Sequence, residues 1–442
     1  MKYLSGIMGK KIVYVAVLSL VLMPVPQAFS QTLNELVKET LQTNPEVQAA
    51  QSNMAAIKQM VRQAKAGYLP TVDFAAGYGT EYSDNSTTRA ITNYHHETMG
   101  RGESSLSVNQ MLFDGFRTKH DKARVEALYL AAKNNLNQTS ESVAGNTLSA
   151  FLEVIKRHEL LELIKDNVLL HQRSLKKIKR KVEVGGGNQV DVQQTESRLA
   201  LASSSHAMGE IALKNSKARF FRITGQTVTE LTRPDPVMDL IPNSLEKAWE
   251  IALVNHPGLQ ASQANLLAAR AEKEGARSAL FPKVNLELNY TNNGNISGAA
   301  GHSHSASAMV RLRYNLFSGW ADEAKGDELM ERINQRQELL EQARRTIREQ
   351  VETTWETLQG TISRIAHLEK HQKISQEVTL SYHNQFKLGK RTFLDVLNSE
   401  TELFNAKSTL VSAQIEYLKM VYQLLSQMGL VRQSLGIERS EG

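Results

Sequence analysis

The sequence has 442 residues, no cysteine and a formal net charge of +6 at pH 7. Without cysteine the chain can form neither disulfides nor thiolate zinc sites, and without a long run of lysine or arginine it gives no support for a nucleic-acid partner. Its length is sufficient for two or three ordinary domains.

Residues 1–30 are typical of a secretory signal peptide. Three lysines and the apolar run 12–23 precede Ala28-Phe29-Ser30, which places small residues at the cleavage positions. Removing this segment takes away three lysines and no acid, so the formal charge falls from +6 to +3. Beyond it no apolar stretch approaches the ~20 residues of a membrane-spanning helix. Any insertion into a membrane must therefore use strands.

The rest of the chain contains one large repeat. Asn44-Pro45 recurs as His256-Pro257, and Leu112-Phe113 recurs as Leu316-Phe317, an offset of 204 (316 − 112) that also relates Asp191 to Asp395. Two copies of one large unit, rather than a series of short solenoid repeats, follow from this spacing. We predict a first repeat over 31–225, an equatorial linker over 226–243, a second repeat over 244–430 and a polar C-terminal tail over 431–442.

Each repeat begins with short helices, which are followed by two stretches in which apolar and polar residues alternate. They predict one β-hairpin at about 71–112 and another at about 283–316, with strands of roughly the length of membrane-barrel strands. A soluble antiparallel sheet with one wet face shows the same alternation, so the pattern alone leaves both open. The connecting segments Tyr82–Gly102 and Asn293–Ser305 are polar and are expected to be external loops.

Long helices follow the hairpins. We expect them over 116–184 and 319–387, each ~100 Å long, with return helices over 190–225 and 393–429. From the lengths, we expect the helix starting at Pro257 to stack with the first return helix, and the helix starting at Pro45 to stack with the second. Apolar residues step by three and four, as in coiled-coil seams; the first seam is Leu161, Ile164, Val168, His171, Leu175, Ile178 and Val182. His171 is interpreted as a packed residue rather than a metal ligand.

Four strands cannot close a barrel. Open edges facing lipid leave N–H and C=O groups unpaired, at several kcal/mol each, so a membrane barrel must be shared between subunits.

Several motifs resemble those of the TolC-type outer-membrane efflux family. They are Asn-Pro and Leu-Pro before the hairpins, Phe-Asp-Gly and Phe-Ser-Gly at the strand-to-helix joins, and 388–392 (LGKRT) followed by 395–397 (DVL). The resemblance covers nearly all of the mature chain. It implies a mainly α fold with a small β part, in which a homotrimer forms a twelve-stranded barrel in the outer membrane and a twelve-helix tunnel in the periplasm.

The resemblance also implies partners. They are a periplasmic membrane-fusion adaptor, an inner-membrane transporter and outer-membrane lipid; no cofactor is implied. The stretch from Val184 to Ala202, with three consecutive glycines, is most similar to the branch that serves type I protein secretion, which favours a transporter of the ABC type.

The two helix-to-helix turns are the main candidate site. Glycine permits the positive φ that reverses the chain, and the resemblance makes Val184, Gly185, Gly186, Leu388 and Gly389 adaptor-docking residues. The alternative is ordinary turn chemistry without a partner. Gly389-Lys390-Arg391-Thr392 is not a phosphate-binding loop, because the first glycine of that motif is missing.

The same resemblance places a channel constriction just beyond the turns. Asp395 occupies the lumen-facing acidic position, where three copies would attract cations, and Asn398 stands where the drug-exporting relative has a second aspartate. Phe386 replaces the tyrosine that closes that relative's tip. This leaves Arg391 and Asp191 as candidates for a closing link.

Other polar residues give weaker signals. Exposed loop polarity explains His95, His96, His302 and His304, and we expect no metal site there. Glu196 and Glu400 occupy matching positions, but no nucleophile–base set accompanies them, so we expect no enzyme. An export duct that serves type I protein secretion is the leading hypothesis, and a drug-efflux channel of the same fold is one alternative. A soluble periplasmic coiled-coil scaffold is the other alternative.

Overall fold

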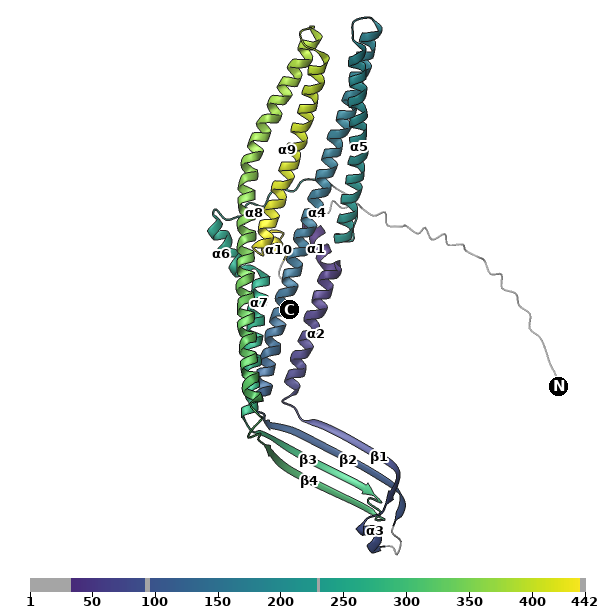
Figure 1. Cartoon of the computed structure of the whole chain (residues 1–442), viewed down its shortest axis with the longest axis vertical. Helices are drawn as coiled ribbons and strands as arrows, with labels where there is room; N and C mark the ends of the chain where they lie inside the picture. The colour runs from purple at the N-terminus through teal and green to yellow at the C-terminus, as the bar shows by residue number, and fades with distance from the viewer. Residues whose placement is uncertain (1–32, 92–95, 229–230, 438–442) are drawn as a thin grey trace, which may run out of the picture.

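The computed structural model describes residues 33–91, 96–228 and 231–437. The predicted signal peptide lies outside the described residues. Figure 1 shows a long helical rod with a four-stranded sheet set at an angle to one end of it. At the other end the rod divides into two helical hairpins, each with a short turn at its tip. Helix and strand are therefore separated along the length of the molecule.

The sheet is antiparallel, with its strands in the order β1-β2-β3-β4. The strands are β1 (Thr71–Ser83), β2 (Glu97–Phe113), β3 (Lys283–Gly294) and β4 (His302–Arg313). The hairpins of the two repeats lie next to one another because β2 pairs with β3. The outer strands β1 and β4 each leave one edge unpaired in the single chain.

One face of the sheet is apolar. The register aligns Val72, Val108, Leu288 and Ala308 across the four strands, and Phe74, Leu106, Tyr290 and Ala306 in the next such row. Side chains in one row stand on the same face, yet Val72 is 62% and Phe74 is 72% exposed. The sheet thus presents an apolar surface that the rest of its own chain does not cover.

The first connecting segment differs from the expected loop. β1 continues to Ser83, β2 already begins at Glu97, and a short helix, α3 (Ser86–Ile91), lies between them. Asn85 explains this helix, because its side-chain oxygen accepts hydrogen bonds from the backbone N–H groups of Thr87 at 2.8 Å and Thr88 at 3.1 Å, the usual chemistry of a helix N-cap. The prediction of an external loop over 82–102 was therefore partly wrong, because both strands extend into this segment and α3 lies between them.

Two helices of equal length form the frame of the rod. α4 (Arg117–Glu183) and α8 (Ala321–Lys387) each contain 67 residues, which corresponds to ~100 Å. Their first and last residues are related by the same offset of 204, so the two helices match without an insertion. Each follows a glycine with positive φ: a Cβ on Gly115 would lie 2.8 Å from the carbonyl oxygen of Ser278. The strand-to-helix corner therefore requires glycine.

Shorter helices pack along this frame (Figure 1). They are α1 (Leu33–Thr43), α2 (Pro45–Ala66), α5 (Gln189–Thr224), α6 (Leu245–Asn255), α7 (Pro257–Ala276), the 3-10 turn η1 (Arg277–Leu280), α9 (Phe393–Gln427) and α10 (Val431–Ser434). The main core includes Leu148, Leu152, Val351, Leu358 and Leu425, all nearly inaccessible to solvent. Among the described residues, no helix combines the length and the apolar character needed to cross a membrane.

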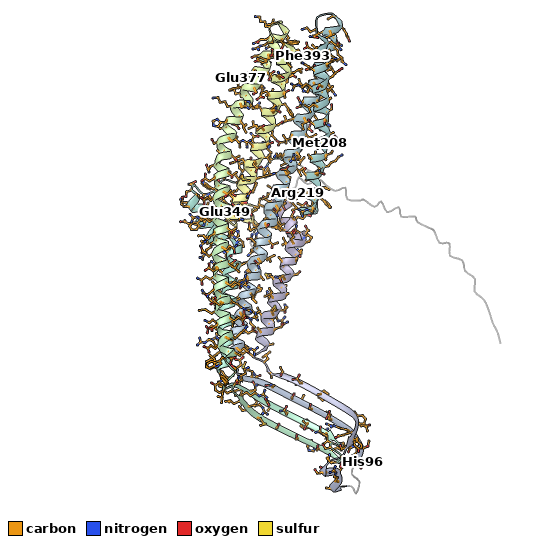
Figure 2. All side chains as sticks on the ribbon, in the orientation of Figure 1. His96, Met208, Arg219, Glu349, Glu377 and Phe393 are labelled. Carbon is orange, nitrogen blue, oxygen red and sulfur yellow. The ribbon has the colours of Figure 1, made fainter. Side chains whose placement is uncertain are left out.

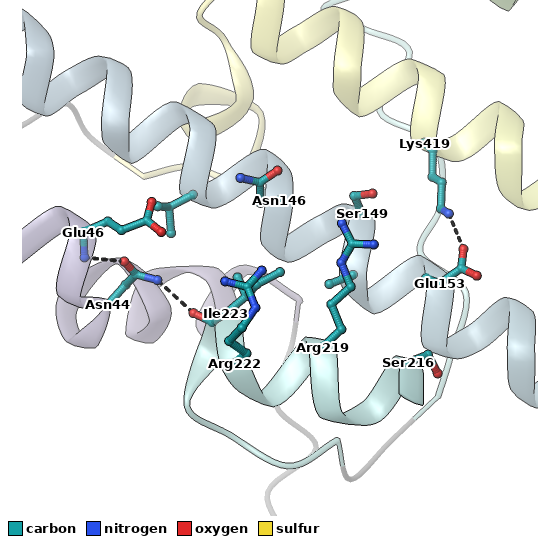
Figure 3. Close-up of a pocket in the computed structure, with 12 residues that line it drawn as sticks. Asn44, Glu46, Asn146, Ser149, Glu153, Ser216, Arg219, Arg222, Ile223 and Lys419 are labelled. Atoms are coloured by element: carbon teal, nitrogen blue, oxygen red, sulfur yellow. Dashed lines mark hydrogen bonds and ion pairs between the residues drawn. The ribbon is translucent and has the colours of Figure 1, made fainter. Parts of the chain in front are cut away.

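The end-to-end stacking is the reverse of the expected one. At the end of α5, the Asn44 amide donates to the carbonyl oxygen of Ile223 at 2.9 Å, while its side-chain oxygen accepts from the N–H of Glu46 at 2.9 Å (Figure 3). Asn44 therefore joins α5 to α2. At the end of α9, a Cβ on Gly429 would lie 3.2 Å from Pro257, the first residue of α7. Lengths could not decide between the two arrangements because α2 and α7 have 22 and 20 residues.

The C-terminal segment also differs from expectation. In place of a polar tail, the described part of 431–442 packs against α4, with Val431 and Leu435 buried. The Arg432 guanidinium lies 3.0 Å from a carboxylate oxygen of Glu141 and donates to Asn137 at 2.9 Å. Since Arg432 and Glu141 are both at least 97% buried, this pair fixes the end of the chain to the middle of the rod.

One pair of contacting positions occurs in both repeats, with different residues and different burial. Lys179 and Glu196 form an ion pair at 2.7 Å, with each side chain 48% exposed. The same positions in the second repeat hold His383 and Glu400, 2.9 Å apart, and the Glu400 side chain is only 1% exposed. Burial raises the pKa of the Glu400 carboxyl to about 7, and burial lowers the pKa of His383. The second repeat therefore buries the Glu400 carboxyl, which is about half protonated at pH 7, beside a His383 side chain that is 37% exposed.

We predict that Glu400→Gln stabilises the protein at pH 8 and changes its stability by only about 1 kcal/mol or less at pH 5. The folded pKa of Glu400 lies above its ordinary value of 4.5, so the carboxyl opposes folding increasingly as pH rises through that interval. The gain at pH 8 should reach about 3 kcal/mol, from 1.36 kcal/mol per pKa unit. Chemical unfolding of the purified protein at both pH values measures it.

The matched control is Glu196→Gln, which removes the equivalent but exposed carboxylate. It should change stability by less than about 1 kcal/mol at either pH, as exposed ion pairs do. A gain for Glu400→Gln that is the same at pH 5 and pH 8 would contradict the assigned titration.

We also predict that Arg432→Met destabilises the protein by about 3–5 kcal/mol, because it leaves the Glu141 carboxylate buried without its cation. Adding Glu141→Leu should recover most of that loss, since an apolar pair of similar volume replaces a buried ion pair at little cost. Unfolding that is equally easy in the single variant and the wild type would show that the buried pair does not hold the C-terminal segment.

Candidate functional site at the hairpin tips

The turns at the two tips have the same backbone hydrogen bonds. In the first, the N–H of Gly186 donates to the carbonyl of Lys181 at 2.9 Å; in the second, the N–H of Lys390 donates to the carbonyl of Gln385 at 2.9 Å. This six-to-one bond is the Schellman motif, which needs a left-handed residue just before it. Gly185 (φ 76°) and Gly389 (φ 71°) fill that position. The glycine pattern is thus explained by the turn itself.

Each turn presents an apolar residue to solvent. Val184 is 82% exposed and Leu388 is 70% exposed. Both follow the last residue of a long helix, at the extreme end of the rod (Figure 1). The predicted docking residues therefore form two accessible tips of similar shape.

Asp395 has a structural role as well as a charge. Its carboxylate accepts from the backbone N–H of Thr392 at 3.1 Å and from the Thr392 hydroxyl at 2.9 Å, while the hydroxyl accepts from the Asp395 N–H. These reciprocal bonds form a capping box at the start of α9. They are the main reason that the Asp395 pKa is lowered, with a smaller contribution from Arg391. The carboxylate is therefore charged at neutral pH.

Within the chain, Arg391 does not reach Asp191. Its guanidinium donates to Gln385 at 3.1 Å, lies 4.5 Å from the Tyr382 ring centre and stands 3.9 Å from Asp395. All three partners belong to its own hairpin. The expected closing link between Arg391 and Asp191 is thus absent from the described residues of a single chain, because partners closer in sequence occupy the guanidinium.

An apolar cluster joins the two hairpins instead. Ile178 and Val192 from the first hairpin pack with Phe393 and Leu397 from the second. The Phe386 ring lies at the edge of this cluster, with the Lys181 ammonium 4.6 Å from its centre. Figure 2 labels Phe393 near the tip. Packing and a cation–π contact, typically worth about 0.5–2 kcal/mol, therefore hold Phe386 in place.

Sequence reasoning missed the main polar link between α5 and α9. The Arg198 guanidinium donates to the side-chain oxygen of Asn398 and to the hydroxyl of Thr401, both at 3.0 Å. Asn398 was expected to weaken a ring of acids, and in the structure it also holds an arginine of the other hairpin. The bonding partners are about two hundred residues apart in sequence, and no local motif distinguishes Arg198 from the other helix arginines.

Other sequence candidates have ordinary roles. His171 is buried in the seam, and burial lowers its pKa, with Arg198 adding to the effect. Within 33–91, 96–228 and 231–437, no three histidine, aspartate or glutamate side chains gather as a metal site. His95 lies outside the described residues. Glu196 and Glu400 pair with Lys179 and His383, as described above.

A second polar site lies at the middle of the rod. A cavity of about 230 Å³ opens where α2, α4, α5 and α9 meet, and Figure 3 shows Arg219 and Arg222 beside it. Lys419 reaches Glu153 at 2.5 Å and closes one side. The junction of stacked helices explains this cavity.

Comparison with known proteins agrees with the fold. The model of the family described as "Outer membrane efflux protein" matches residues 36–226 and 249–430, the greater part of both repeats. The outer membrane efflux protein BepC of Brucella suis is 23% identical, over 93% of this chain and 88% of that protein. The alkaline protease secretion protein AprF of Pseudomonas aeruginosa is 22% identical, over 88% and 83% respectively.

Solved structures show the same architecture. The outer-membrane channel OprN superposes with a TM-score of 0.79 at 18% identity, over 90% of this chain and 89% of that one. The open state of the Neisseria gonorrhoeae MtrE channel has a TM-score of 0.76 at 16% identity, over 90% and 89%. Channels of the matched family work as trimers with periplasmic adaptors and inner-membrane pumps. Since the family model covers both repeats, the chain belongs to the outer membrane efflux protein family, as a channel subunit of the outer membrane whose helices lie in the periplasm.

Proposed function

We propose that three copies of this chain form a passive duct from the periplasm to the exterior, and that its cargo is protein exported by a type I secretion system. The observation that supports the duct is the structure of the sheet, which has an apolar face, two unpaired edges and attachment to helices ~100 Å long. Strand edges facing lipid must be paired. Three copies placed edge to edge satisfy every edge with the same β1–β4 contact.

The assignment to protein secretion rests on the first tip. Its three consecutive glycines and the start of the return helix are most similar to the type I secretion branch. Among the relatives, AprF and the protein PrtF of Dickeya chrysanthemi carry names that specify protease secretion. An ABC-type transporter, reached through an adaptor docked at Val184 and Leu388, fits this assignment.

Small-molecule efflux by the same fold is the competing function. It is favoured by other relatives, since BepC is named as an efflux protein and SrpC of Pseudomonas putida as part of a solvent efflux pump. Both functions use the same duct and differ in the transporter that loads it.

Deletion of the gene separates these functions. We predict that it removes one or a few large proteins from the culture medium and leaves sensitivity to drugs and detergents unchanged. Re-expression of the full chain should restore the secreted proteins. Increased drug sensitivity with an unchanged secreted profile would assign the chain to small-molecule efflux.

We propose that the tip contacts hold the channel in a resting closed state. Within one chain the hairpins are held together by the apolar cluster around Phe393 and by the Arg198 bonds to Asn398 and Thr401. Opening would separate the hairpins and break these bonds. Because the polar link uses a single guanidinium, it can be removed without disturbing the turns.

We predict that Arg198→Gln raises the resting conductance of the trimer in planar bilayers about two- to tenfold. Loss of hydrogen bonds to a charged donor costs about 1.5–3 kcal/mol, enough to shift a closed–open equilibrium by that factor or more. The control is Arg219→Ala, an arginine of the same helix 21 positions away at the equatorial cavity. Equal conductance in Arg198→Gln and the wild type would show that this link does not hold the tip shut.

We predict that Asp395→Asn reduces the cation preference of the pore at neutral pH. The amide keeps an oxygen to accept from Thr392, so the helix cap survives while three charges disappear. The lowered pKa of Asp395 implies that the wild-type preference persists until the pH falls below the ordinary carboxyl range. Reversal potentials in a salt gradient measure the effect, and unchanged selectivity would contradict a lumen-facing ring.

A further inference from the structure

The end of α4 is unusually basic. Six cations stand between residues 173 and 181, against one acid, Glu183, before the turn. Three of them have partners or neighbours in the chain. Lys179 pairs with Glu196, Lys181 lies over Phe386, and the charge of Lys177 acts on His383 and Glu400.

The other three cations form a basic stripe, which we define as Arg173, Lys176 and Arg180. Their spacing of three and four places them on one face of the helix. That face is opposite the seam of His171, Ile178 and Val182. All three are exposed, and none has an ion-pair partner in the part of the chain that the structure describes. The stripe runs ~10 Å along the helix and ends close to the exposed Val184.

The second hairpin provides an internal comparison. Since α4 and α8 have the same length and the same turn, the offset of 204 relates the stripe to Glu377, Leu380 and Asn384. Glu377 is labelled on α8 in Figure 2, and Leu380 is 65% exposed. The helix and its turn therefore form equally well without these cations. Cations near the C-terminus of a helix interact favourably with the helix dipole, by about 0.3–1 kcal/mol per charge. Because α8 forms without cations at these positions, this interaction does not explain the three cations of the stripe.

We propose that the basic stripe docks an acidic helix face of the periplasmic adaptor, an inference that rests on the proposed function. A partner helix with carboxylates three and four residues apart matches the stripe in spacing and charge. The neighbouring Val184 adds an apolar contact at the tip. In a trimer, three basic tips would alternate with three tips that carry Glu377 and Leu380. The stripe thus lets a partner distinguish the first tip from the second.

The test uses the full-length trimer in detergent and a labelled helical peptide, (EAAEAAQ)3, whose glutamates are three and four residues apart and therefore share one side of the helix. The variant is Arg173→Gln with Lys176→Gln and Arg180→Gln. The control removes the same charge from the second hairpin, through Lys370→Gln, Lys373→Gln and Lys387→Gln. Fluorescence anisotropy gives the dissociation constants at about 50 and about 300 mM salt, between which the Debye length falls from about 14 Å to about 6 Å.

We expect the stripe variant to bind about tenfold more weakly than the wild type at low salt, from three exposed ion pairs of 0.2–1 kcal/mol each. The control should stay within about twofold, and high salt should weaken wild-type binding. Equal loss in both variants would overturn the proposal. So would a stripe variant that binds normally but changes the ion selectivity of the pore, because the stripe would then line the tunnel.

The same purified proteins can test the docking proposal independently of the proposed channel function. Pore formation in bilayers depends on the sheet, so the stripe variant should conduct as the wild type does. A wild-type protein that forms no pore would contradict the proposed function whatever the peptide result. A conducting wild type without preference for the acidic peptide over a (KAAKAAQ)3 peptide would contradict the docking surface alone.

Discussion

The structure depends on the requirement that every backbone hydrogen-bonding group in a lipid environment have a partner. A sheet of four strands satisfies its interior groups and leaves β1 and β4 with free edges. Its apolar face, with Phe74 at 72% exposure, is uncovered by the same chain. Both problems are solved at once when copies of the chain meet edge to edge around an axis. The long helices are then carried by the same symmetry, so that closing the sheet also encloses a tunnel.

Duplication explains how one chain builds this object and where its halves diverge. The two long helices have kept identical lengths and identical tip turns, because a tube needs walls of equal height. Side chains at matching positions have changed more freely. Lys179 with Glu196 is an exposed ion pair, whereas in the pair of His383 with Glu400 the carboxyl is buried and its pKa is raised. Residues 173–181 of the first hairpin carry six lysines and arginines, whereas the matching residues 377–385 of the second carry none. Backbone geometry is conserved between the halves, and specific chemistry is distributed unequally.

The sequence pattern predicted the strands, the long helices and the tip turns because each of these has a strong local signal. Period-two alternation identified the strands, a seam of three and four identified the helices, and glycine marked the turns. The prediction failed where the deciding interaction joins distant segments. From the sequence, Arg432 was assigned to a polar tail. In the structure it is buried in the core, where the Glu141 carboxylate, 291 residues earlier, neutralises its charge. Lengths alone could not show that α2 stacks with α5, since the Asn44–Ile223 hydrogen bond decides it.

The candidate site was also predicted only in part, where local turn chemistry decides the structure. Val184, Gly185, Leu388 and Gly389 lie at the tips as expected from local turn chemistry. The contacts that join the tips were not predictable, because Arg198 reaches Asn398 only after both hairpins have folded. Arg391 is the opposite case. Within the described residues of the chain its guanidinium contacts Gln385 and Tyr382, which are close in sequence, and not the distant Asp191.

The most direct test of this account is the mass of the mature chain, extracted from outer membranes in mild detergent, by native mass spectrometry or multi-angle light scattering. The account predicts a protein mass of three chains that disperses only with detergent and persists on dilution. A monomer that stays in solution without detergent would contradict the shared sheet and, with it, the duct.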